Sequence, residues 1–591
     1  MGTHGCGAPT HPTWLRRVAL RGDVCRDILY RRFGGGGPSL WHKEHVMAKR
    51  QWWLALVAAC AVSTSFSGIA AALGGQRGAE VGSHPASQPG SSAWPLWDLA
   101  RQKQAVHRFS TLITAQQVRD HLGNAAGTEA AIRWCRQTGV TKVYIESFRD
   151  GYQASADTLE AARDRFQREG FEVSGCVTTT RVGKPSTGWR GIACYTDRAT
   201  QERLADIFAF TATRFDEIMI DDFWFTDCTC PMCEAARKAK TVTVLGRQFP
   251  VPGDTWEAYR CELLVQLSRE AILATARRTN PKVRVIIKYP QWYDRFHERG
   301  YEVVRETADF DRIWVGTETR DYHDRRWGGT VQYEGYFIMR WLGGIGGAKC
   351  GGGWYDPYGT TAKTYVEQAR QTILGGARES LLFCYGSLLR DTGPANIEAL
   401  RAHMPALFDV AEQVARRAVV GVAAYKPPGS PPGREERVFD FVGMMGLPLV
   451  PCHEFPEKAP AAFFSFHALK DPDFPAKFSR LLDRGVPVLV TDGLAKALAG
   501  RVALDRPQVR VLAVQGRPAG LLELSQAELD GLRAPVLGAL GRRFEAPNQV
   551  ALYLFADGSW VIENFRDEPA KVKLDGEPLV VPARDWIYRW K

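Results

Sequence analysis

Two adjacent carboxylates, Asp221 and Asp222, follow a short apolar run and are the most distinctive chemical feature of the sequence. The run EIMI, residues 217–220, is typical of a buried strand and would carry both side chains to one end of a sheet. Consecutive strand side chains point to opposite faces, so we expect one of the two to face the centre of the fold. Glu318 ends a second apolar run in the same way. Two carboxyl groups flanking a glycosidic bond can hydrolyse it, one as general acid and the other as nucleophile or base.

These carboxylates also have structural interpretations. Asp221 and Asp222 could cap the turn that follows them, and Glu318 could form a salt bridge with Arg320 or Arg312. Further candidate carboxylates, held in reserve, are Asp321, Glu334 and Asp356.

Aromatic and charged side chains at other strand ends could bind a sugar, because Trp and Tyr rings stack on the C–H faces of sugar rings. The sequence holds 18 Trp, 18 Tyr and 28 Phe, which suits ring-shaped ligands, although large cores also use aromatic residues. Packing between loops is the alternative for each aromatic residue, and Glu146 could orient Lys288. The candidate substrate-binding residues are Glu146, Trp224, Lys288, Tyr289, Trp292, Tyr293, Trp354 and Asp356.

Three cysteines with Cys-x-Cys-x2-Cys spacing, Cys228, Cys230 and Cys233, follow the aspartates. One tight loop can present three such thiolates to a tetrahedral metal ion, and Cys194 is the best fourth ligand. We expect structural zinc that fixes this loop. Two disulfides are the alternative, because the protein looks exported to an oxidising compartment.

Residues 105–416, which must position these side chains, show a repeated pattern of strand followed by helix. Helical periodicity follows each apolar run, and eight such units in residues 105–416 predict a (β/α)8 barrel, with a doubly wound open sheet as the alternative. In such a barrel the active site lies at the carboxyl ends of the strands. The predicted strands are 107–114, 142–148, 171–179, 216–222, 283–289, 312–318, 349–355 and 379–385.

Two smaller patterns follow the barrel. Residues 417–530 alternate strands and helices and predict a small α/β domain. Residues 540–591 alternate apolar and polar residues around turns and predict a small, β-sandwich-like antiparallel domain.

The N-terminal region has the layout of a targeting segment. Residues 47–74 combine a basic start, an apolar run and small residues, as a secretory signal peptide does. Residues 1–46 would then be a mis-annotated extension, and 75–104 a linker. We therefore expect a bacterial protein exported to the periplasm or the outside, with a lipoprotein anchored at Cys60 or one membrane anchor as alternatives.

Composition excludes several classes. With 45% hydrophobic and 24% charged residues, the chain is neither mainly disordered nor a multi-span membrane protein. Nine Lys/Arg and three Asp/Glu in residues 1–50 account for six of the eleven net positive charges, so we expect no nucleic-acid partner. No glycine run follows a strand into a phosphate-binding helix, so we expect no redox cofactor. The run Gly351-Gly352-Gly353 would let the backbone approach a ligand or another loop.

The cysteine loop and the order of domains resemble the glycoside hydrolase family 42 β-galactosidases. Those enzymes carry a Cys-x-Cys-x2-Cys zinc loop after strand four, matched by Cys228, Cys230 and Cys233, and an upstream zinc cysteine, matched by Cys194. Their barrel is followed by a flavodoxin-like trimerisation domain and a small β domain. The resemblance therefore implies a flavodoxin-like fold for residues 417–530 and a homotrimer.

The catalytic motifs depart from that family. Its members have Asn-Glu at the end of strand four, where this chain has Asp221-Asp222, and a nucleophilic Glu on strand seven, where the nearest carboxylate is Asp356. If Asp222 takes the acid/base position, the nucleophile would be Asp356 or Glu318. β-Galactosidase activity is not implied.

The sequence thus predicts an exported glycoside hydrolase that acts on an oligosaccharide, polysaccharide or other glycoside. The alternatives are a non-catalytic carbohydrate-binding barrel protein and a different TIM-barrel hydrolase or lyase.

Overall fold

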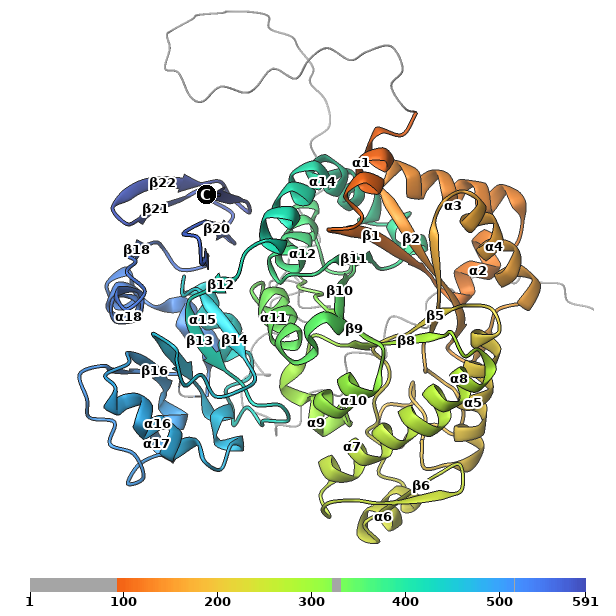
Figure 1. Ribbon diagram of the computed structural model, residues 1–591, viewed down its shortest axis with the longest axis horizontal. Helices are drawn as coiled ribbons and strands as arrows, with labels where there is room; N and C mark the ends of the chain where they lie inside the picture. Colours follow the sequence, from red (N-terminus) through yellow and green to blue (C-terminus); the bar gives the residue numbers. More distant parts are fainter. Residues whose placement is uncertain (1–92, 321–330, 515) are drawn as a thin grey trace, which may run out of the picture. The chain divides into compact units, whose positions relative to one another are not determined.

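A computed structural model describes residues 93–320, 331–514 and 516–591 of the chain (Figure 1). Eight parallel strands form a closed barrel, because β1 pairs with β2 on one side and with β11 on the other. This closure confirms the (β/α)8 prediction and excludes the open doubly wound sheet. The barrel strands are β1 (Arg108–Ile113), β2 (Val140–Arg149), β4 (Glu172–Val177), β5 (Glu217–Ile220), β8 (Arg284–Tyr289), β9 (Arg312–Gly316), β10 (Cys350–Tyr355) and β11 (Glu379–Leu382).

Helices surround the barrel strands in Figure 1. Several begin at a side-chain cap, where Asn124, Asp197, Thr255 or Thr361 accepts a hydrogen bond from a backbone N–H of the first turn. The helices of the barrel region are α1 (Pro95–Lys103), α2 (Ala115–Leu122), α3 (Ala125–Gln137), α4 (Ala156–Arg168), α5 (Arg198–Ala212), α6 (Pro231–Lys238), α7 (Trp256–Leu267), α8 (Ala274–Thr279), α9 (Phe296–Arg299), α10 (Val303–Asp309), α11 (Glu334–Gly346), α12 (Ala362–Leu374), α13 (Tyr385–Leu388) and α14 (Gly393–Ala415). A π-helical segment, Ser268–Leu273, joins α7 to α8. Short strands β3 (Tyr152–Gln153), β6 (Thr241–Val244) and β7 (Arg247–Pro250) form local hairpins.

The interior of the barrel is filled by side chains, including the large rings of Trp314 and Trp354. The glycines of β10 make room for Trp314, because a Cβ at Gly351 would lie 2.3 Å from its ring and one at Gly352 would lie 2.6 Å from its Nε1. The glycine run therefore accommodates a neighbouring side chain inside the barrel.

A buried ionic cluster closes the barrel at the amino ends of the strands. Lys142 of β2 lies 2.6 Å from Glu217 of β5 and 3.7 Å from Glu379 of β11. This end of the barrel is thus a packed, charge-paired layer, which leaves the opposite end for function.

A second sheet follows the barrel and consists of five parallel strands. Its order, β14-β13-β15-β16-β17, is 2-1-3-4-5 in chain order, which is the flavodoxin-like arrangement. The strands are β13 (Val422–Tyr425), β14 (Leu449–Cys452), β15 (Ala462–Phe464), β16 (Val488–Thr491) and β17 (Val509–Leu512), with helices α15 (Val438–Met444), α16 (Phe474–Asp483), α17 (Asp492–Ala497) and α18 (Gln526–Gly538).

The C-terminal region forms two small antiparallel sheets. One has the order β12-β19-β20-β23 and the other β18-β21-β22. The strands are β12 (Val419–Val420), β18 (Phe544–Glu545), β19 (Val550–Phe555), β20 (Trp560–Asn564), β21 (Ala570–Leu574), β22 (Glu577–Val581) and β23 (Trp586–Arg589). β12 shows that the link after α14 joins this sheet before the chain enters the flavodoxin-like sheet.

Within the described ranges, no helix has both the length and the apolar character needed to cross a bilayer. The extension 1–46, the signal-like segment 47–74, Cys60 and Asp321 lie outside the described residues.

Candidate active site

Asp222 and Glu318 meet at the same lysine at the carboxyl end of the barrel strands. Lys288 Nζ donates to Asp222 Oδ2 at 2.8 Å and to Glu318 Oε1 at 2.7 Å. These two carboxylate oxygens therefore lie at most 5.5 Å apart. The three residues come from neighbouring strands, since β8 carries Lys288 and lies between β5 and β9.

Local backbone features deliver the two carboxylates. The N–H of Asp221 donates to Val177 O at 3.1 Å, so the β5 ladder continues one residue beyond the strand and Asp222 follows at its end. A Cβ at Gly316 would lie 2.5 Å from Glu318 Oε2 and 2.9 Å from the Gln291 backbone nitrogen. Glycine at the end of β9 is thus required for the position of Glu318.

Asp221 faces a different set of partners. It accepts from Arg149 Nη2 at 2.6 Å, from Thr178 Oγ1 at 3.0 Å and from the backbone N–H of Asp222 at 2.7 Å. Arg149 also donates to Glu146 at 2.8 Å. Asp221 therefore bonds the backbone of its neighbour Asp222 and lies 4.0 Å from Lys288, and Glu146 orients Arg149.

The two aspartates have opposite shifts of pKa. Burial acts to raise the pKa of Asp221, but the charges of Arg149 and Lys288 outweigh it and hold this pKa below its ordinary value. Burial raises the pKa of Asp222 to about 7; the Lys288 charge opposes the shift and the Asp221 and Glu318 charges support it. Burial also raises the pKa of Glu318, against the charge of Lys288. A proton is therefore retained on the Asp222–Glu318 pair near neutral pH.

Two aromatic rings lie beside this pair. Lys288 Nζ is 4.3 Å from the centroid of the Trp354 ring, which stacks on Phe383 at 5.1 Å. Arg149 lies over the Phe383 ring at 5.5 Å, and Phe383 remains partly exposed. Trp354 thus lies beside Lys288 but is only 2% exposed, and the partly exposed Phe383 is an additional ring there.

Two of the remaining carboxylates are paired away from Lys288. Asp356 accepts from Arg320 Nη2 at 2.7 Å and from the backbone N–H of Tyr358 at 3.1 Å. Glu334 lies 2.5 Å from Arg437, which belongs to the flavodoxin-like domain. Glu318 forms an ion pair with Lys288, while Arg320 pairs with Asp356 and Arg312 lies 3.8 Å from Glu217.

Four predicted substrate-binding aromatics are not brought to the carboxylate pair. Trp224 is fully buried and donates to Ser268 Oγ at 3.0 Å. Tyr289 points away from the barrel interior and its hydroxyl contacts Thr307 Oγ1 at 3.2 Å, because it alternates with the inward-facing Lys288. Tyr293 donates to Asp440 of the flavodoxin-like domain at 3.0 Å. Trp292 is partly exposed and packs edge-on against Phe225 at 5.6 Å.

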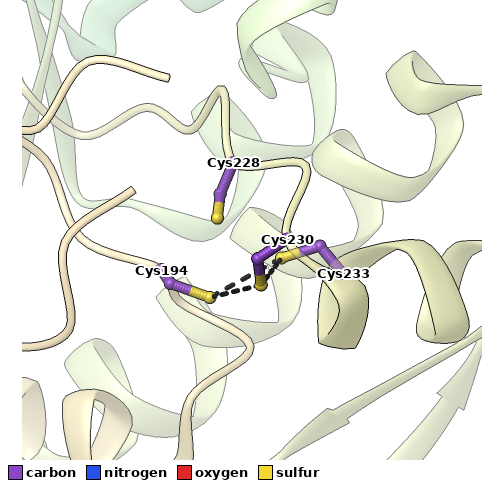
Figure 2. Close-up of side chains that lie close together, drawn as sticks. All are labelled: Cys194, Cys228, Cys230 and Cys233. Carbon is purple, nitrogen blue, oxygen red and sulfur yellow. Dashed lines mark hydrogen bonds between the residues drawn. The ribbon is translucent and has the colours of Figure 1, made fainter. Parts of the chain in front are cut away.

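The four predicted cysteines gather into one cluster (Figure 2). Cys194 Sγ lies 3.6 Å from the sulfurs of Cys230 and Cys233, which are 3.7 Å apart, and all four ligand atoms lie within 4.8 Å of one another. Zn–S bonds of about 2.3 Å in a tetrahedron require sulfurs about 3.8 Å apart, so the spacing fits a metal ion. Bonded sulfurs would be about 2.05 Å apart, and the four cysteines are free thiols.

Residues 95–428, more than half of the chain, match the model of a family described as "Probable glycosyl hydrolase, catalytic domain". The chain belongs to this family. The match covers the barrel and ends in the first residues of the flavodoxin-like domain.

Two individual proteins are similar to this member of the family. An uncharacterised protein of Saccharolobus solfataricus is 28% identical over 342 residues, which are 53% of this chain and 55% of the relative, so the chain matches only about half of the relative's length. The solved structure of α-L-fucosidase isoenzyme 2 from Paenibacillus thiaminolyticus has 10% identity and a TM-score of 0.54, and covers 79% of this chain and 93% of that one. The similarity to the fucosidase structure shows a shared fold and nothing further.

Sequence reasoning missed Arg149, Thr178 and Phe383 in this glycosyl hydrolase domain. Arg149 follows Glu146 by three residues, which on a regular strand would place the two on opposite faces. The pairing of β2 with β4 shifts register between Glu146 and Phe148, and this irregularity brings both side chains to one site. Such a bulge has no clear sequence signal, whereas Phe383 could have been found as the first residue beyond β11.

Proposed function

We propose that this protein is a glycoside hydrolase that cleaves a glycosidic bond with the carboxyl groups of Asp222 and Glu318. The observation that carries the proposal is their convergence on Lys288, with oxygens at most 5.5 Å apart, at the carboxyl end of a (β/α)8 barrel. Retaining glycosidases hold their two carboxyl groups about 5–5.5 Å apart, and inverting enzymes about 6.5–9.5 Å apart. The spacing supports retention of configuration at the anomeric carbon.

In a retaining reaction one carboxylic acid protonates the leaving oxygen while the other carboxylate attacks the anomeric carbon. A glycosyl-enzyme ester forms and the glycosidic C–O bond breaks; the first group then deprotonates water, which hydrolyses the ester. The raised pKa of Asp222, about 7, keeps one proton on the pair up to near-neutral pH, and this proton supplies the acid. Lys288 stabilises whichever carboxylate is ionised.

The surrounding residues fit this reaction. The partly exposed Phe383, backed by Trp354, offers a ring face for the sugar that loses its bond. Arg149 and Asp221 fix the end of β5, and therefore the direction of the Asp222 side chain.

The test is turnover of a panel of aryl α- and β-glycosides by residues 75–591 and by Asp222→Asn and Glu318→Gln. We expect each variant to lose at least about a hundredfold in kcat, the usual contribution of a single acid or base. Asp505→Asn, an exposed position in the flavodoxin-like domain, is the matched control and should keep full activity. Full activity in both site variants, with unchanged melting temperature, would refute the assignment.

Azide separates the two roles. Azide replaces the missing carboxylate in both variants, but with opposite stereochemistry. The acid/base variant should give a glycosyl azide with the configuration of the substrate, and the nucleophile variant one with the inverted configuration. Inverted sugar released by the unmodified protein would contradict the retaining mechanism.

We also propose that the four-cysteine cluster holds zinc with a structural role. All four ligands are buried cysteines, which leaves no open position of the kind that a catalytic zinc uses. The purified protein should contain one zinc per chain, and Cys230→Ser should lose it while Cys452→Ser, a free thiol outside the cluster, should retain it. Full zinc content in Cys230→Ser would contradict the assignment.

Export remains a proposal that rests on residues 47–74. Expression of the full chain with fractionation of the cells should place the mature protein outside the cytoplasm, and the mature N-terminus read by mass spectrometry should follow residue 70. Retention of residues 47–74 in a cytoplasmic product would contradict export. The homotrimer implied by family 42 stays a prediction.

A further inference from the structure

Four aromatic side chains form a continuous group in the segments that follow β4, β5 and β8. The ring of Trp189 lies 5.5 Å from Phe223 and 5.9 Å from Phe225, and Phe225 contacts Trp292 at 5.6 Å. Trp189, Phe223 and Trp292 remain partly exposed, whereas Phe225 is buried. We call these four residues the outer aromatic group.

The outer aromatic group begins at the reacting residues. Phe223 directly follows Asp222, and its backbone oxygen is held by Thr179 Oγ1 at 2.9 Å. Trp292 lies in the segment after β8, four residues beyond Lys288. The group therefore belongs to the same end of the barrel as the two carboxylates.

Specific contacts hold Trp189 in place. Asp227 accepts from the backbone N–H of Trp189 at 2.9 Å, from Ser186 Oγ at 2.6 Å and from Arg299 Nη1 at 3.0 Å. Asp227 directly precedes Cys228, so the cysteine loop and the position of Trp189 are linked through one residue.

Two glycines make this arrangement possible. A Cβ at Gly188 would lie 2.3 Å from the Asp227 carboxyl carbon, and one at Gly191 would lie 2.3 Å from the Trp189 ring. The turn is thus shaped to place an indole ring at the rim while leaving part of it exposed. Partly exposed rings held rigidly beside a reaction centre are suited to bind an amphipathic ligand.

We propose that the outer aromatic group is a second sugar-binding subsite, which holds the sugar residue on the leaving-group side of the bond. The proposal rests on the proposed hydrolase function and makes the substrate an oligosaccharide or polysaccharide rather than a glycoside with a small aglycone. The partly exposed Phe383 follows β11 and the partly exposed Phe223 follows β5, and these two strands lie on opposite sides of the eight-stranded barrel. A sugar on Phe383 and a sugar on the outer aromatic group would therefore occupy opposite sides of the carboxyl end of the barrel.

The first experiment compares two substrates that share the same non-reducing sugar. One is the disaccharide or trisaccharide cleaved by the protein; the other is the glycosyl fluoride, whose leaving group is a single atom and cannot stack. Trp189→Ala should lower kcat/KM for the oligosaccharide on the order of tenfold, mainly through KM, and leave the fluoride unchanged. Trp189→Phe, which keeps a ring, should retain most of the oligosaccharide activity.

Trp590→Ala, a partly exposed tryptophan next to the C-terminus, is the matched control and should change neither substrate. Equal losses on both substrates in Trp189→Ala, or no loss on either, would overturn the subsite.

A binding experiment separates this proposal from the hydrolase function. Calorimetry measures binding of di- to tetrasaccharides of glucose, galactose, mannose and xylose to the protein and to Trp189→Ala. If no glycoside is hydrolysed but an oligosaccharide binds and Trp189→Ala weakens that binding, the hydrolase proposal fails and the subsite stands. If none of these sugars binds the unmodified protein, or if Trp189→Ala binds them equally well, the subsite is refuted.

Discussion

Lys288→Met tests the electrostatic basis of the proposed mechanism. Lys288 Nζ contacts Asp222 at 2.8 Å and Glu318 at 2.7 Å, and its side chain is 1% exposed. Methionine has a similar length and removes only the charge and the hydrogen bonds. The two carboxyl groups then lie close together with no shared cation.

An opposite charge at this distance lowers the pKa of a carboxyl group by about 1–3 units. Removal of Lys288 should therefore raise the pKa values of the Asp222–Glu318 pair by that amount, beginning from a pKa of about 7 for Asp222. The ionised carboxylate needed for attack becomes scarcer at a given acidic pH. On the acidic limb, which reports the first ionisation of the pair, we expect kcat/KM at a given pH to fall about ten- to a thousandfold, with part of the loss recovered as pH rises.

Stability should depend on pH in a definite direction. In the variant the folded pKa values of Asp222 and Glu318 lie further above the unfolded values near 4. Protonation of these two groups adds to the free energy of unfolding. This contribution is complete at pH values below the unfolded pKa near 4, and it is lost as the pH rises through the raised pKa of the folded state. The melting temperature of Lys288→Met should therefore fall further below that of the unmodified protein at pH 8 than at pH 5.

The assay is the pH dependence of kcat/KM with an aryl glycoside, together with thermal unfolding across the same pH range. Lys142→Met is the matched control, because Lys142 is equally buried and bonds Glu217 at 2.6 Å at the opposite end of the barrel. The Lys142→Met variant should lose about 3–5 kcal/mol in its free energy of unfolding, and the acidic limb of its kcat/KM profile should stay in place. An unmoved acidic limb in Lys288→Met would refute the role of Lys288.

Three further predictions address the support of the site. Gly316→Ala should displace Glu318 and lower kcat at least tenfold, since its Cβ would lie 2.5 Å from Oε2, whereas Gly343→Ala meets no atom within 4 Å and should be neutral in the same assay. Arg149→Met leaves Asp221 without its ion pair at 2.6 Å and should cost about 3–5 kcal/mol in urea unfolding at pH 7; a loss below 1 kcal/mol would contradict this. Chelation of the bound metal should lower the melting temperature more than kcat measured at 25 °C on the glycosyl fluoride, and the opposite order would indicate a catalytic metal.

The barrel was predictable because most of its strands are short apolar runs and helical periodicity follows them. Closure of the sheet by β1 and β11 confirms what the repeat of eight units indicated. The strand order of the α/β domain, in contrast, was not predictable from the sequence pattern. Its alternating elements indicated an α/β domain, but only the family resemblance pointed to the flavodoxin-like order, since sequence periodicity carries no information about which strands are neighbours.

Within the candidate site, the residues at the strand ends were predicted better than their orientations. Lys288 and Tyr289 are adjacent, and both were candidates, but strand alternation sends only Lys288 inward. Tyr293 was also chosen for its position after the strand, yet its hydroxyl bonds Asp440, more than a hundred residues later in the chain. Contacts between domains of this kind have no local signal in the sequence.

The charge count at the carboxyl end of the barrel explains why an acid resides there. Among the described residues at this point, Glu146, Asp221, Asp222 and Glu318 are held by two cations, Arg149 and Lys288. Four ionised carboxylates would leave an excess negative charge in a buried place, and burial makes that charge costly. Arg149 keeps Asp221 ionised, so the proton falls on the pair around Lys288, where the pKa of Asp222 reaches about 7. The supply of a proton to a leaving group thus follows from having fewer cations than carboxylates at this point, which is why Lys288→Met and Arg149→Met should have different consequences. The first moves the pH profile of the reaction, and the second mainly destabilises the fold.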